Sequence, residues 1–66
     1  SKRNKEIFKW REEIAEEDNI PPAFIFKNKH LKTLSKIQPN DKLARKKIMT
    51  ILGDNYLVEK FIITFL

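Results

Sequence analysis

Carboxylates are the residues in this sequence whose types and spacing come nearest to a catalytic site. Five of them lie within one short stretch, and they are Glu12, Glu13, Glu16, Glu17 and Asp18. Carboxylates from several elements hold the paired metal ions of many nucleases. Here all five belong to a single segment, and no second element supplies partner carboxylates. We therefore expect a solvated acidic helix face and no metal site.

The other chemistry-bearing residues also lack partners. His30 is the single histidine and lies at the edge of the apolar face of a predicted helix, so we expect it to pack or cap. There is no cysteine, which excludes disulfides and thiolate metal sites. No glycine-rich phosphate loop with a following lysine is present. The sequence predicts a domain that is not an enzyme by itself and that needs no cofactor.

Positive charge is the stronger functional signal. Residues 1–11 carry a net charge of +4, residues 12–18 carry −5, residues 27–47 carry +7 and residues 48–66 carry −1. Two basic segments thus flank an acidic one, a pattern that can present a positive face to a polyanion. The alternative is that the lysines only keep a small domain soluble.

Aromatic residues add candidates for stacking on unpaired bases. Trp10 falls on the apolar stripe of the first helix with Ile7 and Ile14, so we expect it in the core. Tyr56 lies off the apolar stripe of the last helix and stays a candidate. The predicted nucleic-acid-binding residues are Lys29, Lys32, Lys36, Lys42, Arg45, Lys46, Lys47 and Tyr56, with Lys2, Arg3 and Lys5 as an extension. No base-reading motif is present, so binding is expected to be weak and independent of sequence.

Apolar periodicity predicts an all-α fold, a compact bundle of about five short helices. These helices are expected up to Asp18, over residues 22–26, from Lys29 to Ile37, from about Lys42 to Leu52, and from near Asn55 onward. Asn28 and then Asn40 or Asp41 are the expected N-caps, and Gly53 is the expected left-handed C-cap. No apolar run approaches the roughly 18 residues needed to span a bilayer.

Two apolar stretches remain to be placed. Residues 23–26 in "IPPAFIF" are apolar nearly all round, so we expect the whole turn to fill the core. In the last helix, Tyr56, Leu57 and Ile63 extend the apolar surface beyond the core stripe, and the chain stops on "FIITFL". We therefore expect a module excised from a longer protein, with a last helix that docks against its parent.

The segment "WREEIAEEDNIPPAFIFKNKHLKTLSKIQP" resembles the HRDC domain, the helicase and RNase D C-terminal module of RecQ-type helicases and ribonuclease D. The double proline after an acidic helix is the most specific element. The matching positions, over about residues 5–66, are Trp10-Arg11-Glu12, Ile14-Ala15, Ile20-Pro21-Pro22, Ile25-Phe26, Leu31, Leu34, Pro39, Val58-Glu59-Lys60-Phe61 and Phe65-Leu66. The resemblance implies one domain over residues 1–66, an orthogonal five-helix bundle similar to SAM domains.

The sequence departs from the family in two places. Many members have a Gly-x-Gly turn before the last helix, whereas Gly53-Asp54-Asn55 keeps only the first glycine and adds a negative charge. This change argues against contact between the turn's amides and a phosphate. The segment from Pro39 to Gly53 is also longer than is usual, and its basic residues shift the expected contact surface toward "KLARKK".

The resemblance implies an auxiliary domain of a RecQ-type helicase or a ribonuclease D-type exonuclease, in DNA repair or RNA processing. Such a domain would hold single-stranded or partly duplex substrate through its basic surface. The alternative is a protein-docking module, or one that docks to the parent's own catalytic domains, with little nucleic-acid contact. We expect a monomer that does not bind membranes, in the cytoplasm, the nucleoid or the nucleus.

Overall fold

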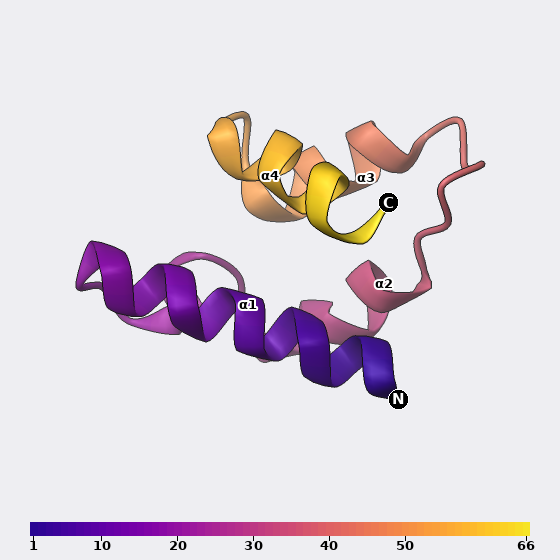
Figure 1. Ribbon diagram of the computed structural model, residues 1–66. Helices are drawn as coiled ribbons and strands as arrows, with labels where there is room; N and C mark the ends of the chain where they lie inside the picture. Colours follow the sequence, from indigo (N-terminus) through magenta and orange to yellow (C-terminus); the bar gives the residue numbers. More distant parts are fainter. The chain divides into compact units, whose positions relative to one another are not determined.

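Six helical segments make up the chain, which the computed structural model describes from residue 1 to residue 66. They are α1 (Lys2–Asp18), the 3₁₀ helices η1 (Pro22–Phe24) and η2 (Asn28–His30), α2 (Leu31–Lys36), α3 (Ala44–Leu52) and α4 (Tyr56–Phe65) (Figure 1). The predicted all-α class is confirmed, with four α-helices where about five were expected. The chain divides into an N-terminal unit, residues 1–36, and a C-terminal unit, residues 37–66. None of the helices is both long and apolar enough to cross a membrane.

Helix α1 begins and ends at side chains suited to those positions. The Ser1 hydroxyl accepts a hydrogen bond from the Asn4 amide at 3.2 Å, which satisfies one of the free amides of the first turn. Asn19 ends the helix in the left-handed conformation, with φ 55° and ψ 46°, as asparagine can. The predicted end of the helix is therefore confirmed, and so is the burial of the core stripe that contains Trp10.

Arg11 connects α1 to the proline turn from a buried position, with only 4% of the residue exposed. Its Nη1 donates a hydrogen bond to the carbonyl of Phe26 at 2.9 Å, and its Nε donates to the Glu12 carboxylate at 3.3 Å. The guanidinium also lies over the rings of Phe8 and Phe26, 4.9 Å from each ring centre. The arginine thereby fixes the end of the turn against the helix.

The proline turn is tighter and less buried than the sequence predicted. The Phe24 and Ile25 amides donate to the carbonyls of Pro21 and Pro22, each at 3.0 Å, so η1 is one 3₁₀ turn and not a short α-helix. Ile25 and Phe26 are buried as expected, but Phe24 is 76% exposed and Ala23 is exposed too. The prediction was wrong for these two residues because three residues per turn point side chains in three directions, and only part of them can face α1.

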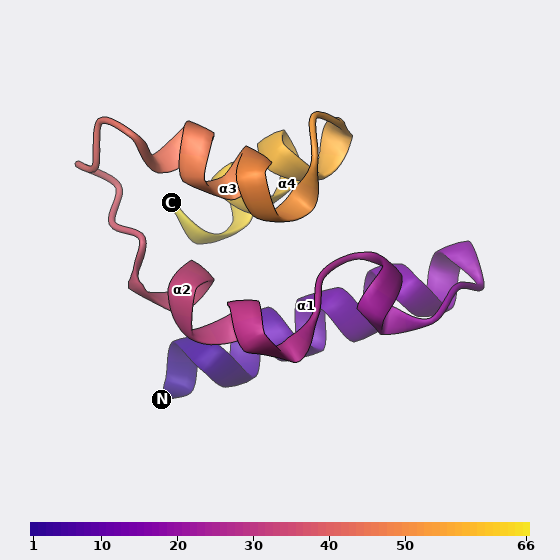
Figure 2. The same ribbon diagram turned by 180° about the vertical axis from the view of Figure 1, so that it is seen from behind.

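The rest of the N-terminal unit packs along α1. Figure 2 shows η1 beside the C-terminal half of α1 and α2 beside its N-terminal half. Leu34 of α2 is fully buried. The expected cap at Asn28 is wrong, because Lys27 holds the N-cap position without a side-chain hydrogen bond and Asn28 lies inside η2.

The C-terminal unit is a pair of helices, α3 and α4, that pack on each other. Helix α3 begins at Ala44, two residues later than expected, and ends at Gly53, whose φ of 88° suits glycine. Its ψ of 169° places Gly53 outside the left-handed helical region that was expected. Asn55 then caps α4, since its Oδ1 accepts from the Leu57 amide at 2.9 Å while its Nδ2 donates to the Leu52 carbonyl at 2.8 Å.

Burial within α4 differs from the prediction at several positions. Ile62, Phe65 and Leu66 were expected in the core stripe with Val58 and Phe61, and they are only half-buried. Val58 and Phe61 are buried as expected, and Tyr56 and Ile63 are exposed as expected. Leu57, which was placed on the exposed apolar surface, is buried. In its first turn α4 thus turns two adjacent residues inward, so the core stripe there is wider than the periodicity suggested.

Replacing Arg11 by methionine tests how far the N-terminal unit depends on the guanidinium. Arg11→Met keeps an unbranched apolar side chain but leaves the buried Phe26 carbonyl without its hydrogen-bond donor. A loss of about 1–3 kcal/mol in the free energy of unfolding is expected for such an unpaired group. Urea unfolding followed by the fluorescence of Trp10 measures it. Lys9→Met, the same change at an exposed residue of α1, should stay within about 0.5 kcal/mol of the wild type. Equal midpoints for the two variants would contradict the prediction.

Candidate nucleic-acid interface

Apart from the extension Lys2, Arg3 and Lys5 in α1, three of the predicted binding residues lie in the N-terminal unit. Lys29 belongs to η2, while Lys32 and Lys36 belong to α2, and all three are exposed. Lys32 and Lys36 are four residues apart on one helix, so they share a face, which lies away from the buried Leu34. None of the three lysines forms an ion pair. We call them the α2 lysines.

Four more predicted cations, Lys42, Arg45, Lys46 and Lys47, lie in the C-terminal unit, and all four are exposed. Two of them are paired with acids. Arg45 forms a salt bridge with Glu59 of α4, and Lys47 Nζ contacts Asp41 Oδ2 at 2.5 Å. Lys42 and Lys46 have no acidic partner. Fewer cations can therefore contact a phosphate without first breaking an ion pair than the sequence indicated.

The position of these cations explains the pairing. Arg45, Lys46 and Lys47 stand in the first turn of α3, where the positive end of the helix dipole disfavours cations. The N-cap residue, Leu43, contributes no side-chain acceptor. Asp41 supplies the missing negative charge, since its Oδ1 accepts from the Leu43 amide at 2.8 Å while its other oxygen binds Lys47. The prediction that Asn40 or Asp41 is the N-cap is therefore wrong, because Leu43 holds that position and Asp41 acts from two residues before it.

These contacts lower the pKa of Asp41 below its ordinary value of 3.8. The hydrogen bond from Lys47 is the largest cause, followed by the hydrogen bond from the Leu43 amide. Both favour the ionised carboxylate. Because the pKa is lower in the folded state, this stabilisation is present above the unfolded pKa and disappears as the pH falls through the folded value.

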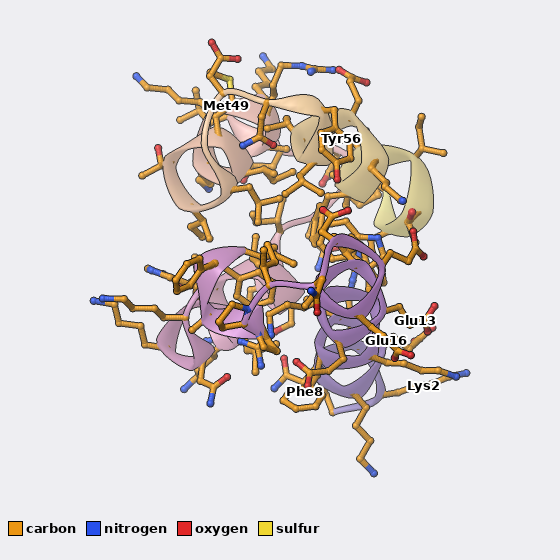
Figure 3. The ribbon with its side chains drawn as sticks, turned by 90° about the vertical axis from the view of Figure 1, so that its left-hand side faces the viewer. Lys2, Phe8, Glu13, Glu16, Met49 and Tyr56 are labelled. Carbon is orange, nitrogen blue, oxygen red and sulfur yellow. The ribbon has the colours of Figure 1, made fainter.

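Tyr56 is the aromatic residue that the sequence placed at the interface. It is the first residue of α4 and is 60% exposed (Figure 3). Trp10 is buried, as predicted, and offers no open ring face for a base. The turn before Tyr56 uses its amides internally, because Gly53 donates to the Met49 carbonyl at 2.8 Å and Asn55 donates to the Gly53 carbonyl at 3.1 Å.

The acidic residues of α1 form no group that could hold a metal ion. Figure 3 shows Glu13 and Glu16 extending from one side of α1, together with Lys2, and Phe8 extending from a different side. No three acidic or histidine side chains come together in a group that could hold a metal ion. His30 is half-buried at the end of η2, next to α2.

Two kinds of residue near the interface were missed by the sequence analysis. Glu59 neutralises Arg45 from another helix, 14 residues along the chain, and no local pattern signals that pairing. Phe8 and Phe24 are exposed aromatic residues, at 42% and 76%. The apolar character of Phe24 predicted burial, and only the packing of the proline turn shows that this residue faces solvent.

Fold and surface together describe a small all-α domain with exposed cations and no clustered metal-binding groups. The sequence profile of the HRDC domain matches residues 2–56, which is most of the chain, and the chain therefore belongs to the HRDC domain family. HRDC domains are non-catalytic accessory domains. The match runs from α1 through α3 and ends at the first residue of α4, so the likeness noted for residues 58–66 lies outside it. Searches of curated proteins and of solved structures gave no match.

The contact between Asp41 and Lys47 predicts a specific change in titration. Lys47→Met should raise the pKa of Asp41 toward its ordinary value, because the largest cause of the lowering is removed. The pKa should stay somewhat low, since the Leu43 amide still donates. Carbon NMR of the side-chain carboxyl during a pH titration measures it. Lys46→Met removes a neighbouring charge that does not contact Asp41, and it should leave the pKa nearly unchanged. An ordinary Asp41 pKa in the wild type would contradict the assignment.

Proposed function

We propose that this HRDC domain is an auxiliary nucleic-acid-binding domain of a RecQ-type helicase or a ribonuclease D-type exonuclease. The observation that carries the proposal is the exposure of the cations in residues 27–47, where eight basic residues accompany one acidic residue. The α2 lysines, Lys42 and Lys46 have no acid to neutralise them. A phosphate backbone is the polyanion that such exposed cations attract most strongly.

The mechanism is electrostatic. Each lysine that contacts a phosphate releases a condensed counterion, which favours binding at low salt and gives no preference for base sequence. Arg45 and Lys47 can join by exchanging Glu59 and Asp41 for phosphate, since exposed ion pairs contribute little stability. Tyr56 adds a ring on which an unpaired base can stack. The domain thereby keeps single-stranded or partly duplex substrate near the catalytic domains of its parent.

Salt dependence is the direct test. We expect Lys42→Gln with Lys46→Gln, and separately the three α2 lysines changed to glutamine, to weaken binding of labelled single-stranded DNA. Each lost phosphate contact should reduce the slope of log K against log salt by about 0.7. Fluorescence anisotropy at several salt concentrations measures this, with single-stranded RNA and duplex DNA in parallel.

Lys9→Gln is the control for these variants, because Lys9 is an exposed lysine of α1 that is not part of the proposed surface. It should leave the slope nearly unchanged. Absence of binding to every strand type at low salt would exclude the proposed function. Slopes that stay equal in all variants would exclude these lysines as the contacts.

A docking function is the second candidate, and one observation favours it. Ile63 of α4 is 81% exposed, although it is a large apolar residue. Such a side chain suits contact with another protein domain. The expected docking surface also included Leu57, which is buried, so the candidate now rests on Ile63 with the half-buried Leu66.

Substitution of Ile63 separates the two functions in the full-length parent enzyme. Ile63→Asp should lower the activity of the parent if α4 docks, because a buried charge at an interface is costly. It should leave the affinity of the isolated domain for nucleic acid unchanged. Thr64→Asp places the same charge at the neighbouring exposed residue and serves as the control. Full activity of the Ile63→Asp enzyme would exclude docking through this residue.

A further inference from the structure

A shallow groove in the N-terminal unit is the feature that the proposed lysine contacts leave unused. It has a volume of about 280 Å³ and is lined by Asn4, Lys5 and Phe8 of α1 and by Leu31 of α2. The Phe8 ring and the Leu31 side chain make the lining mostly apolar. Lys5 is exposed, so its ammonium group can reach past the apolar lining to the solvent.

Phe8 gives the groove an aromatic wall that is already held in place. The ring is 42% exposed, and the Arg11 guanidinium lies 4.9 Å from its centre. Arg11 is itself fixed by the Phe26 carbonyl. The ring therefore loses little conformational freedom when a ligand binds, which favours affinity.

The charge around the groove selects an anionic ligand. Lys5 lines it, and Lys32, an exposed lysine without an ion-pair partner, directly follows Leu31. Lys29 stands two residues before Leu31 and is exposed as well. An apolar wall with a lysine in its lining matches a flat ring that is carried on a phosphate backbone.

We infer that the groove binds one unpaired nucleobase, stacked on Phe8 and packed against Leu31, with the flanking phosphates on Lys5 and the α2 lysines. This inference rests on the proposed nucleic-acid function and adds a preference for single strands to it. A paired base is inaccessible inside a duplex unless it is flipped out at an energetic cost. A folded protein partner fits less well, because a groove with four lining residues is far smaller than a stable protein interface.

The test combines two measurements on the 66-residue chain, with a twelve-nucleotide single strand and the matching duplex as ligands. In the wild type, the methyl resonances of Leu31 should shift in NMR spectra with the single strand, because a stacked base places its ring current there. They should not shift with the duplex. Phe8→Leu should weaken single-strand binding about tenfold, within the range for loss of one stacked base. Phe8→Tyr keeps the ring and should retain the affinity.

The outcomes separate this inference from the function on which it rests. If the single strand binds with the expected salt dependence while the Leu31 methyls stay in place and Phe8→Leu binds normally, the groove proposal is wrong and the lysine surface stands. If neither strand binds at low salt, both proposals are wrong. If the methyls shift instead with an acidic peptide that carries one aromatic residue, the groove is a peptide site and the nucleobase assignment is overturned. Urea unfolding of Phe8→Leu shows whether it is folded, and the wild-type spectra decide the question in either case.

Discussion

The buried guanidinium of Arg11 is the interaction on which the N-terminal unit depends. A charge removed from water is costly unless it is paired and hydrogen-bonded. Here the Phe26 carbonyl, the Glu12 carboxylate and two aromatic rings all surround it. Meeting these requirements at once fixes the end of the proline turn against α1. The same contact holds Phe8 at the surface, so one structural arginine also shapes the apolar groove.

Charge placement connects the fold to the proposed function. The carboxylates of α1 that project from its free side stay in solvent, while Asp41 and Glu59 each neutralise one cation of α3. These two acids offset the repulsion between the cations in the first turn of α3 and the positive end of the helix dipole. They also reduce the free positive charge of the C-terminal unit. The α2 lysines have no such partners, so among the predicted binding residues they outnumber the unpaired cations of the C-terminal unit, Lys42 and Lys46.

Two kinds of contact are combined in the proposed interface, and they differ in what they recognise. Lysines attract any phosphate backbone, so they determine affinity and salt dependence but not strand type. Aromatic side chains such as Phe8 and Tyr56 require an unpaired base, so they can distinguish a single strand from a duplex.

The sequence alone determined the helical class, the family, the end of α1 and most of the core, because these follow from apolar periodicity, turn residues and a specific proline motif. It also identified the exposed lysines of the candidate interface. Only the tertiary structure showed that Phe24 faces solvent, that Leu57 is buried and that Arg45 is paired with Glu59. The groove likewise joins Phe8 to Leu31 across two helices. Such features depend on which residues from distant segments meet, and local sequence patterns carry no information about that.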